Sequence, residues 1–76
     1  MRFFFDLVQD SVLTADDTGV EFDTAEAAKA EAARTVLEVA ADLFHNPFRS
    51  LAIQLRDPSG RMIHIAELRF YARDLP

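Results

Sequence analysis

Apolar and polar positions alternate along the start of the chain, and this pattern predicts a strand over residues 2–8. Phe3, Phe5 and Leu7 fall on one side of it, because successive side chains of a strand point to opposite faces. We expect this side to face the core. The residues that follow predict a turn at 9–10, a short second strand at 11–15, a turn at 16–19 that uses Gly19 at positive φ, and an extended segment at 20–22.

A long run without glycine or proline predicts a helix from Thr24 to about Phe44. Asp23 is the expected N-cap, because Glu26 follows it at the spacing of a capping box. The sequence His45-Asn46-Pro47 should end the helix, since proline disfavours helical geometry in the preceding residue. One apolar stripe recurs at steps of three and four residues and should face the sheet: Ala25, Ala28, Ala32, Val36, Val39, Ala40 and Leu43.

Regular alternation predicts a strand over 50–56 that points Leu51, Ile53 and Leu55 inward. A hairpin turn at 57–60 and a partner strand from 61 to about 72 follow. The alternation of this last strand slips, so two arrangements are open. A β-bulge near Ala66-Glu67 would keep Ile63, Ile65, Leu68 and Phe70 inward; without a bulge, the inward residues would be Met62, His64, Ala66, Leu68 and Phe70.

The element order is therefore β-β-α-β-β within one domain that covers residues 1–76. We predict an α+β fold of two layers, an antiparallel sheet with one long helix packed on one face. A single helix covers one face of a sheet, and nothing else in the sequence is expected to cover the other face.

Several motifs resemble those of an uncharacterised family of short bacterial proteins, a domain of unknown function. They are Arg2-x-Phe4-Phe5-Asp6, Asp17-x-Gly19-x-Glu21, Glu26-Ala27, Glu31-Ala32 and Arg56-Asp57-x-x-Gly60. The chain departs from the family pattern at Phe44–Phe48, where members more often carry a polar loop with glycine. Because the motifs are turn and cap residues, the resemblance implies a fold and no catalytic residue. At the level of the fold, the element order also resembles the small HicB-type antitoxins.

Composition narrows the class of protein. With 76 residues and no cysteine, the chain lacks a disulfide framework and a thiolate metal site. Asp6 and Asp10 interrupt the apolar start too early for a signal peptide. No apolar run reaches the roughly 18–20 residues that span a membrane. We expect a cytoplasmic protein without membrane contact.

Candidate chemistry is sparse. His45 and His64 lack the further ligands that a metal site needs, and each is interpreted as structural. The carboxylates of residues 16–26 do not have calcium-loop spacing, so they are interpreted as turn formers and acidic residues near a helix start. The serines lack the flanking glycines of a nucleophile elbow, and two glycines cannot build a phosphate loop. We expect no catalytic residue, no cofactor, no metal and no enzymatic activity.

The sheet face away from the helix is the expected contact surface. Strand parity gives it aromatic, small apolar and charged side chains, and monomers seldom leave such a surface bare. The predicted interface residues are Phe4, Val8, Arg56, Arg69, Tyr71 and Arg73.

Charge is uneven between the two parts of the chain and bears on the choice of partner. Residues 1–42 carry a net charge of −7 and residues 43–76 a net charge of +2. We favour self-association into a homodimer, either through this face or by pairing of edge strands. Binding to another small protein, as an antitoxin-like module, is the second reading. Single-stranded nucleic acid, stacked on Phe4 and Tyr71, ranks lower because the acidic helix would repel a polyanion. A monomer with an ordinary mixed surface also stays open.

Overall fold

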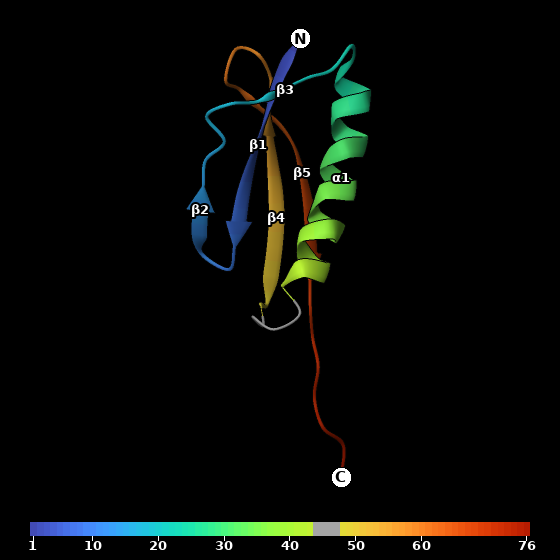
Figure 1. Ribbon diagram of the computed structural model, residues 1–76. Helices are drawn as coiled ribbons and strands as arrows, with labels where there is room; N and C mark the ends of the chain where they lie inside the picture. Colours follow the sequence, from blue (N-terminus) through green and yellow to red (C-terminus); the bar gives the residue numbers. More distant parts are fainter. Residues whose placement is uncertain (44–47) are drawn as a thin grey trace.

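The computed structural model describes residues 1–43 and 48–76, and its architecture confirms the predicted α+β class (Figure 1). Antiparallel strands form one sheet, and one helix lies along one face of it. The predicted end of the helix at Phe44 and the His45-Asn46-Pro47 stop lie outside the described residues. The elements are, in chain order, β1 (Arg2–Gln9), β2 (Val12–Thr14), β3 (Val20–Glu21), α1 (Ala25–Asp42), β4 (Ser50–Arg56) and β5 (Met62–Arg69).

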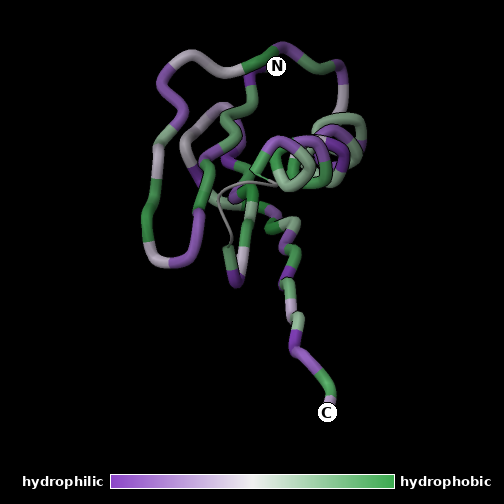
Figure 2. The backbone as a smooth tube through the Cα atoms, turned by 60° about the horizontal axis from the view of Figure 1, so that its bottom comes forward, coloured by the Kyte–Doolittle hydropathy of each residue, from purple (hydrophilic) through white to green (hydrophobic). Residues whose placement is uncertain are grey.

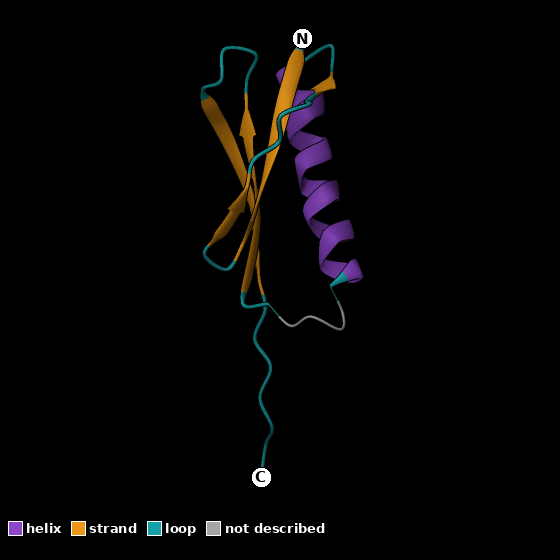
Figure 3. Cartoon of the chain, turned by 60° about the vertical axis from the view of Figure 1, so that its left-hand side comes forward, coloured by secondary structure: helices purple, strands orange, loops and turns teal. Residues whose placement is uncertain are grey.

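The strand order is β2-β1-β4-β5, and the two-residue β3 pairs with the start of β1. The predicted extended segment at 20–22 therefore contributes a short strand. All pairings are antiparallel, so β1 and β4 form the centre of the sheet and β5 forms one edge. Figure 3 shows α1 along one side of the strands, with the other side free of helix.

The core lies between α1 and the sheet, on the strand faces that alternation predicts. Phe3, Leu51, Ile53 and Leu55 are the largest fully buried side chains. They meet the small residues of the helix stripe, of which Ala28, Ala32 and Val36 are buried. Alanine lets the helix axis approach the strands closely, so large side chains on the sheet fill the layer between them. The predicted inward faces of the 2–8 and 50–56 strands are confirmed.

The N-cap of α1 is Thr24, and the prediction of Asp23 is wrong by one residue. The Thr24 backbone is extended, and its hydroxyl accepts a hydrogen bond of 3.1 Å from the N–H of Ala27. Because the cap sits one residue later, Glu26 no longer stands at the third helical position that a capping box requires. At the other end the helix closes at Asp42, where the N–H of Leu43 bonds to Val39 and Ala40.

A β-bulge is present in β5, but at Ile63 rather than near Ala66-Glu67. Leu55 pairs with His64 and Arg56 pairs with Met62, so Ile63 is the extra residue. Ile63 therefore packs toward the core on one side of the bulge.

After the bulge the even positions point inward, as the arrangement without a bulge predicts for His64, Ala66 and Leu68. Met62 and Phe70 are exposed, against that arrangement, and Ile65 is half exposed, against the bulged one. The displaced bulge thus turns Met62 outward and leaves the facing of His64, Ala66 and Leu68 as in the arrangement without a bulge.

The last strand ends at Arg69 rather than near Ala72. Arg69 pairs with Ser50, the first residue of β4, so the sheet offers the following residues no neighbouring strand. The final ladder contact is the hydrogen bond from the Phe70 N–H to the Arg49 carbonyl, 2.9 Å. Residues 70–76 then run away from the body as a tail in which apolar and polar residues are mixed (Figure 2), and the longest dimension of the chain is 52 Å.

Candidate functional site

The sheet surface opposite α1, which we call the outer face, follows from the strand register. Directly paired residues share a face, so the residues opposite the core positions can be assigned strand by strand. The outer face contains Phe4, Asp6 and Val8 of β1, Leu13 of β2, Ala52, Gln54 and Arg56 of β4, and Met62, Ile65, Glu67 and Arg69 of β5.

One end of the outer face, which we call the closed end, is occupied by an ion pair between Asp6 and Arg56. Arg56 donates from Nε to Asp6 Oδ2 at 2.7 Å and from Nη2 to Asp6 Oδ1 at 3.0 Å, a bidentate geometry. Asp6 is only 6% exposed. The hydrogen bonds from Arg56 lower the pKa of Asp6 against the opposing effect of burial. The guanidinium also lies 4.8 Å from the centre of the Phe4 ring.

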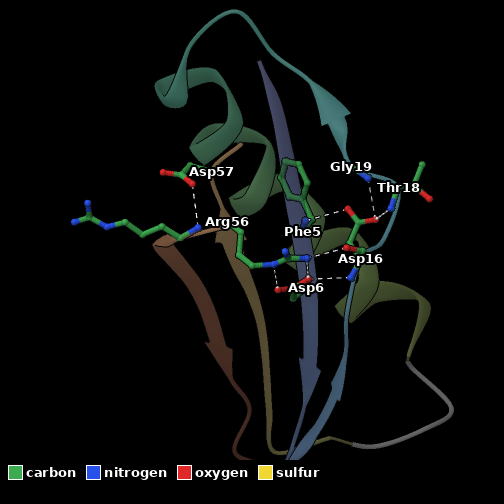
Figure 4. Close-up of polar contacts among 8 residues, drawn as sticks. Phe5, Asp6, Asp16, Thr18, Gly19, Arg56 and Asp57 are labelled. Carbon is green, nitrogen blue, oxygen red and sulfur yellow. Dashed lines mark hydrogen bonds and ion pairs between the residues drawn. The ribbon is translucent and has the colours of Figure 1, made fainter. Parts of the chain in front are cut away.

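The loop of residues 15–19 joins this ion pair through Asp16 (Figure 4). The N–H of Asp16 donates to Asp6 Oδ1 at 2.8 Å, and its carbonyl accepts from Arg56 Nη2 at 2.8 Å. The Asp16 carboxylate accepts hydrogen bonds from the N–H groups of Phe5, Thr18 and Gly19. Burial raises the pKa of Asp16, but these hydrogen bonds outweigh it and the net pKa lies below the ordinary value.

The loop takes this shape because β2 and β3 both pair with the same edge of β1 and leave a gap between them. Leu7 pairs with Thr14 of β2 and Phe3 pairs with Val20 of β3, which leaves Phe5 without a strand partner on that side. The Asp16 carboxylate accepts the hydrogen bond that a strand would otherwise have taken from Phe5. The Asp16 side chain therefore takes the place of a strand at this gap in the hydrogen bonds along β1.

Gly19 completes the loop, and its predicted positive φ is confirmed at 75°. A Cβ at this position would stand 2.7 Å from Arg2 Cγ and 3.0 Å from the Phe3 carbonyl oxygen. The loop can therefore approach β1 this closely only because residue 19 has no side chain.

The expectation that nothing covers the outer face is therefore wrong at the closed end. The 15–19 loop lies against Phe4, Asp6 and Arg56 there, and in the described part of the chain no buried side-chain polar atom lacks a hydrogen-bond partner. A cluster in which each buried polar group is bonded stabilises the fold. Sequence reasoning missed the cluster, although Asp6 and Arg56 have opposite charges on the same predicted face.

The other end of the outer face, which we call the open end, combines apolar side chains with Glu67 and Arg69, and Ala52 at its centre is only 6% exposed. Val8 pairs with Leu13 on one side and with Ala52 on the other, and Ala52 pairs with Glu67. Leu13 is 58% exposed and Ile65 is 50% exposed. Sequence reasoning listed neither residue on this face, since it assigned no faces to the short second strand and left the facing of Ile65 open between two arrangements.

The six predicted interface residues divide into three groups. Phe4 and Arg56 belong to the closed end, where Arg56 is already bound by Asp6. Val8 and Arg69 lie on the outer face, as strand parity predicts, and at its open end. Tyr71 and Arg73 do not lie on the sheet, because β5 ends at Arg69 and no strand of the described residues lies beside the tail; this is a correction to the predicted face.

Arg69, Tyr71 and Arg73 instead surround a shallow hollow of about 1100 Å³ where the tail leaves the sheet. Phe48 and Phe70 pack together beside it, with ring centres 6.2 Å apart. The neighbouring Glu67 carboxylate is the main cause of a raised pKa for Arg69. Arg69 stays charged, and the Glu67 carboxylate offsets part of the positive charge that it would present to a phosphate.

The described residues contain neither a metal-binding cluster nor a helix that could span a membrane. In residues 1–43 and 48–76, no three histidine or acidic side chains are grouped to hold a metal ion. His64 is half-buried on the face toward the helix, and His45 lies outside the described residues. No helix in this part of the chain is both long enough and apolar enough to cross a membrane.

Comparison with known proteins places the chain in a family. Residues 2–69 match the family described as Domain of unknown function (DUF6894), which covers most of the chain. No curated protein and no solved structure matches the sequence. The chain belongs to this family of unknown function.

Proposed function

We propose that this member of the DUF6894 family is a non-enzymatic interaction module that self-associates through the open end of its outer face. The observation that carries the proposal is the pair of exposed apolar side chains on the outer face, Leu13 opposite Val8 and Ile65 opposite Gln54. An apolar patch of this kind on a sheet without a covering layer is typical of a protein contact surface.

The composition of the open end suits a second copy of the same chain. A two-fold contact requires a surface that is complementary to itself. Here an apolar centre borders Glu67 and Arg69, which carry opposite charges two residues apart. A two-fold axis can therefore bring apolar groups together and set each charge against its opposite.

The surface offers less to a nucleic acid. Of the arginines that could meet phosphates, Arg56 is held by Asp6 and Arg69 by Glu67. The whole chain carries a net charge of −5, which opposes the approach of a polyanion. Self-association needs neither free arginines nor a positive net charge.

Light scattering over a range of micromolar concentrations tests the proposal. We expect the unmodified protein to approach twice its monomer mass of 8.6 kDa as concentration rises. The double variant Leu13→Glu/Ile65→Glu should stay monomeric, because carboxylates would enter the apolar patch. Its far-ultraviolet circular dichroism should equal that of the unmodified chain, since both side chains are exposed.

The matched control is Leu37→Glu, which adds the same charge at a helix position that is 59% exposed. This variant should keep the mass of the unmodified protein. A monomer mass for the unmodified protein at every concentration would reject self-association.

A further inference from the structure

The edge of β5 is longer and less protected than an edge strand usually is. It has eight residues, and within the described residues it pairs only with β4. Edge strands avoid pairing by being short, by carrying charged residues (lysine above all) or proline, by bulges, or by a cover. β5 contains no lysine or proline, and its charged residues Glu67 and Arg69 have opposite signs. Its bulge at Ile63 leaves the six residues from His64 to Arg69 in regular register.

The backbone groups that face away from β4 can be identified. The N–H of Phe70 donates to Arg49, so the backbone of Phe70 points toward β4. Backbone groups alternate in direction along an antiparallel strand. Ile65, Glu67 and Arg69 therefore direct their N–H and carbonyl groups outward, as would Tyr71 if the strand were extended into the tail.

We propose that β5 and residues 70–74 of the tail form an antiparallel strand pair with the same segment of a second copy, about a two-fold axis at Leu68. This inference rests on the self-association in the proposed function, and it places the contact at the β5 edge rather than between outer faces. In this register Glu67 lies opposite Arg69 of the second copy, and Ile65 lies opposite Tyr71 of the second copy.

Charge favours this register over two others that the outward backbone groups allow. An axis at Glu67 would place two carboxylates opposite each other, and an axis at Arg69 would place two guanidinium groups opposite each other. Like charges across a ladder are destabilising. The axis at Leu68 instead forms the Glu67–Arg69 pair twice, and both members are residues whose backbone groups point outward. About eight main-chain hydrogen bonds would join the copies through these pairs.

The apolar residues of the tail are accommodated by the same register. Tyr71 is 83% exposed and Phe70 is 57% exposed, although both are large side chains with apolar surface. In the pair, Tyr71 covers Ile65 of the second copy on the outer face. Phe70 meets Ala66 of the second copy on the face toward the helices, where Leu68 meets its own equivalent. The extended tail thus becomes a strand with apolar neighbours on both faces.

Charge reversal tests the register directly. Glu67→Arg and Arg69→Glu should each weaken the dimer about tenfold, because each variant sets like charges opposite each other twice. The double variant Glu67→Arg/Arg69→Glu restores opposite charges in both pairs, so its dissociation constant should return to within about threefold of the unmodified value. The matched control is Glu38→Arg, an exposed helix residue away from β5 that should leave association unchanged.

Cysteine cross-linking gives a second test, since the chain contains no cysteine of its own. Opposite residues in a hydrogen-bonded pair lie about 5.5 Å apart, within the range that a disulfide spans. The double variant Ile65→Cys/Tyr71→Cys should form a covalent dimer on oxidation. Neither single variant should do so, because in this register the equivalent positions of the two copies are about 20 Å apart along the strands.

The outcomes separate this inference from the proposed function. The strand pairing would be overturned if Leu13→Glu alone dissociates the dimer while the charge reversals leave its dissociation constant unchanged and the double cysteine variant forms no disulfide. Contact between outer faces would then remain as the way in which the chain associates. Rescue by the double charge reversal, together with the disulfide in the double cysteine variant, supports the pairing. A monomeric unmodified protein would reject both.

Discussion

The two edges of the sheet differ in how their free backbone groups are satisfied. Beside β1, the strands β2 and β3 are three and two residues long, and Asp16 accepts the hydrogen bond of Phe5 in the gap between them. At the opposite edge, β5 runs for eight residues with β4 as its one strand partner among the described residues, and it continues into an exposed tail. The β1 edge is completed by a side chain of the same chain, and the outward edge of β5 has no such partner in the described residues.

This difference shows what a polar side chain can replace in a sheet. The Asp16 carboxylate bonds three backbone N–H groups, and the Asp6–Arg56 pair holds its loop against the outer face. Backbone groups are satisfied there without another strand. In the described residues, no side chain accepts the outward backbone hydrogen bonds of β5. Its exposed residue Ile65 and the tail residue Tyr71 are those that the proposed strand pairing would bury.

The largest effect should come from removing the acidic partner at the closed end. Asp6→Ala leaves Arg56 without its bidentate partner in a largely buried position and removes the acceptor for the Asp16 N–H. We expect a loss of about 3 kcal/mol in the free energy of unfolding, measured by urea denaturation. The exposed Arg34–Glu38 pair is the control, and Glu38→Ala should change stability by less than about 0.5 kcal/mol. Equal losses in both variants would contradict the structural role of Asp6.

A smaller effect should follow from closing the space at Gly19. Gly19→Ala imposes a positive φ on alanine and forces its Cβ against Arg2 and the Phe3 carbonyl, so we expect a loss of about 2 kcal/mol. Gly60 also has a positive φ, of 90°, but a Cβ there meets no atom within 4 Å. Gly60→Ala should therefore cost only the backbone strain, about 1 kcal/mol. Thermal or urea unfolding of both variants would measure the difference, and a larger loss at Gly60 would contradict the close approach of the loop.

The smallest effect should be the dependence of stability on pH. The pKa values of Asp6 and Asp16 are lowered below the ordinary 3.8 in the folded chain. A lowered pKa contributes stability that is fully present well above 3.8 and is lost as pH falls through the folded-state values. Urea unfolding between about pH 5 and pH 3 should show this decline, and a flatter decline in Asp6→Asn would assign part of it to Asp6. Stability that rises on acidification would contradict the assignment.

Local patterns were sufficient for the elements and the core, as particular residues show. Phe3, Leu51, Ile53 and Leu55 alternate with less apolar neighbours, and burial follows this alternation because a strand has two faces. The helix stripe behaves in the same way, and the turn at 57–60 forms with Gly60 at positive φ. Such features depend on residues a few positions apart, so the sequence alone predicts them.

The candidate site was predicted less completely, because it depends on pairings between distant segments. Val8 and Arg69 lie on the outer face as expected, whereas Tyr71 lies beyond the end of β5. Whether Arg69 is the last strand residue depends on where β4 begins. The bulge at Ile63 turns Met62 outward, and alternation within β5 does not locate that bulge.

The amino-acid sequence by itself determined the α+β class, the order of the main elements and which face of each central strand is buried, because hydrophobic periodicity and turn residues act locally. Only the tertiary structure decided that Asp16 closes one side of the sheet and that Asp6 and Arg56 meet beneath its loop. Those contacts join residues 10 to 50 positions apart. Their geometry depends on strand register, and register is set by the packing of the whole sheet against the helix.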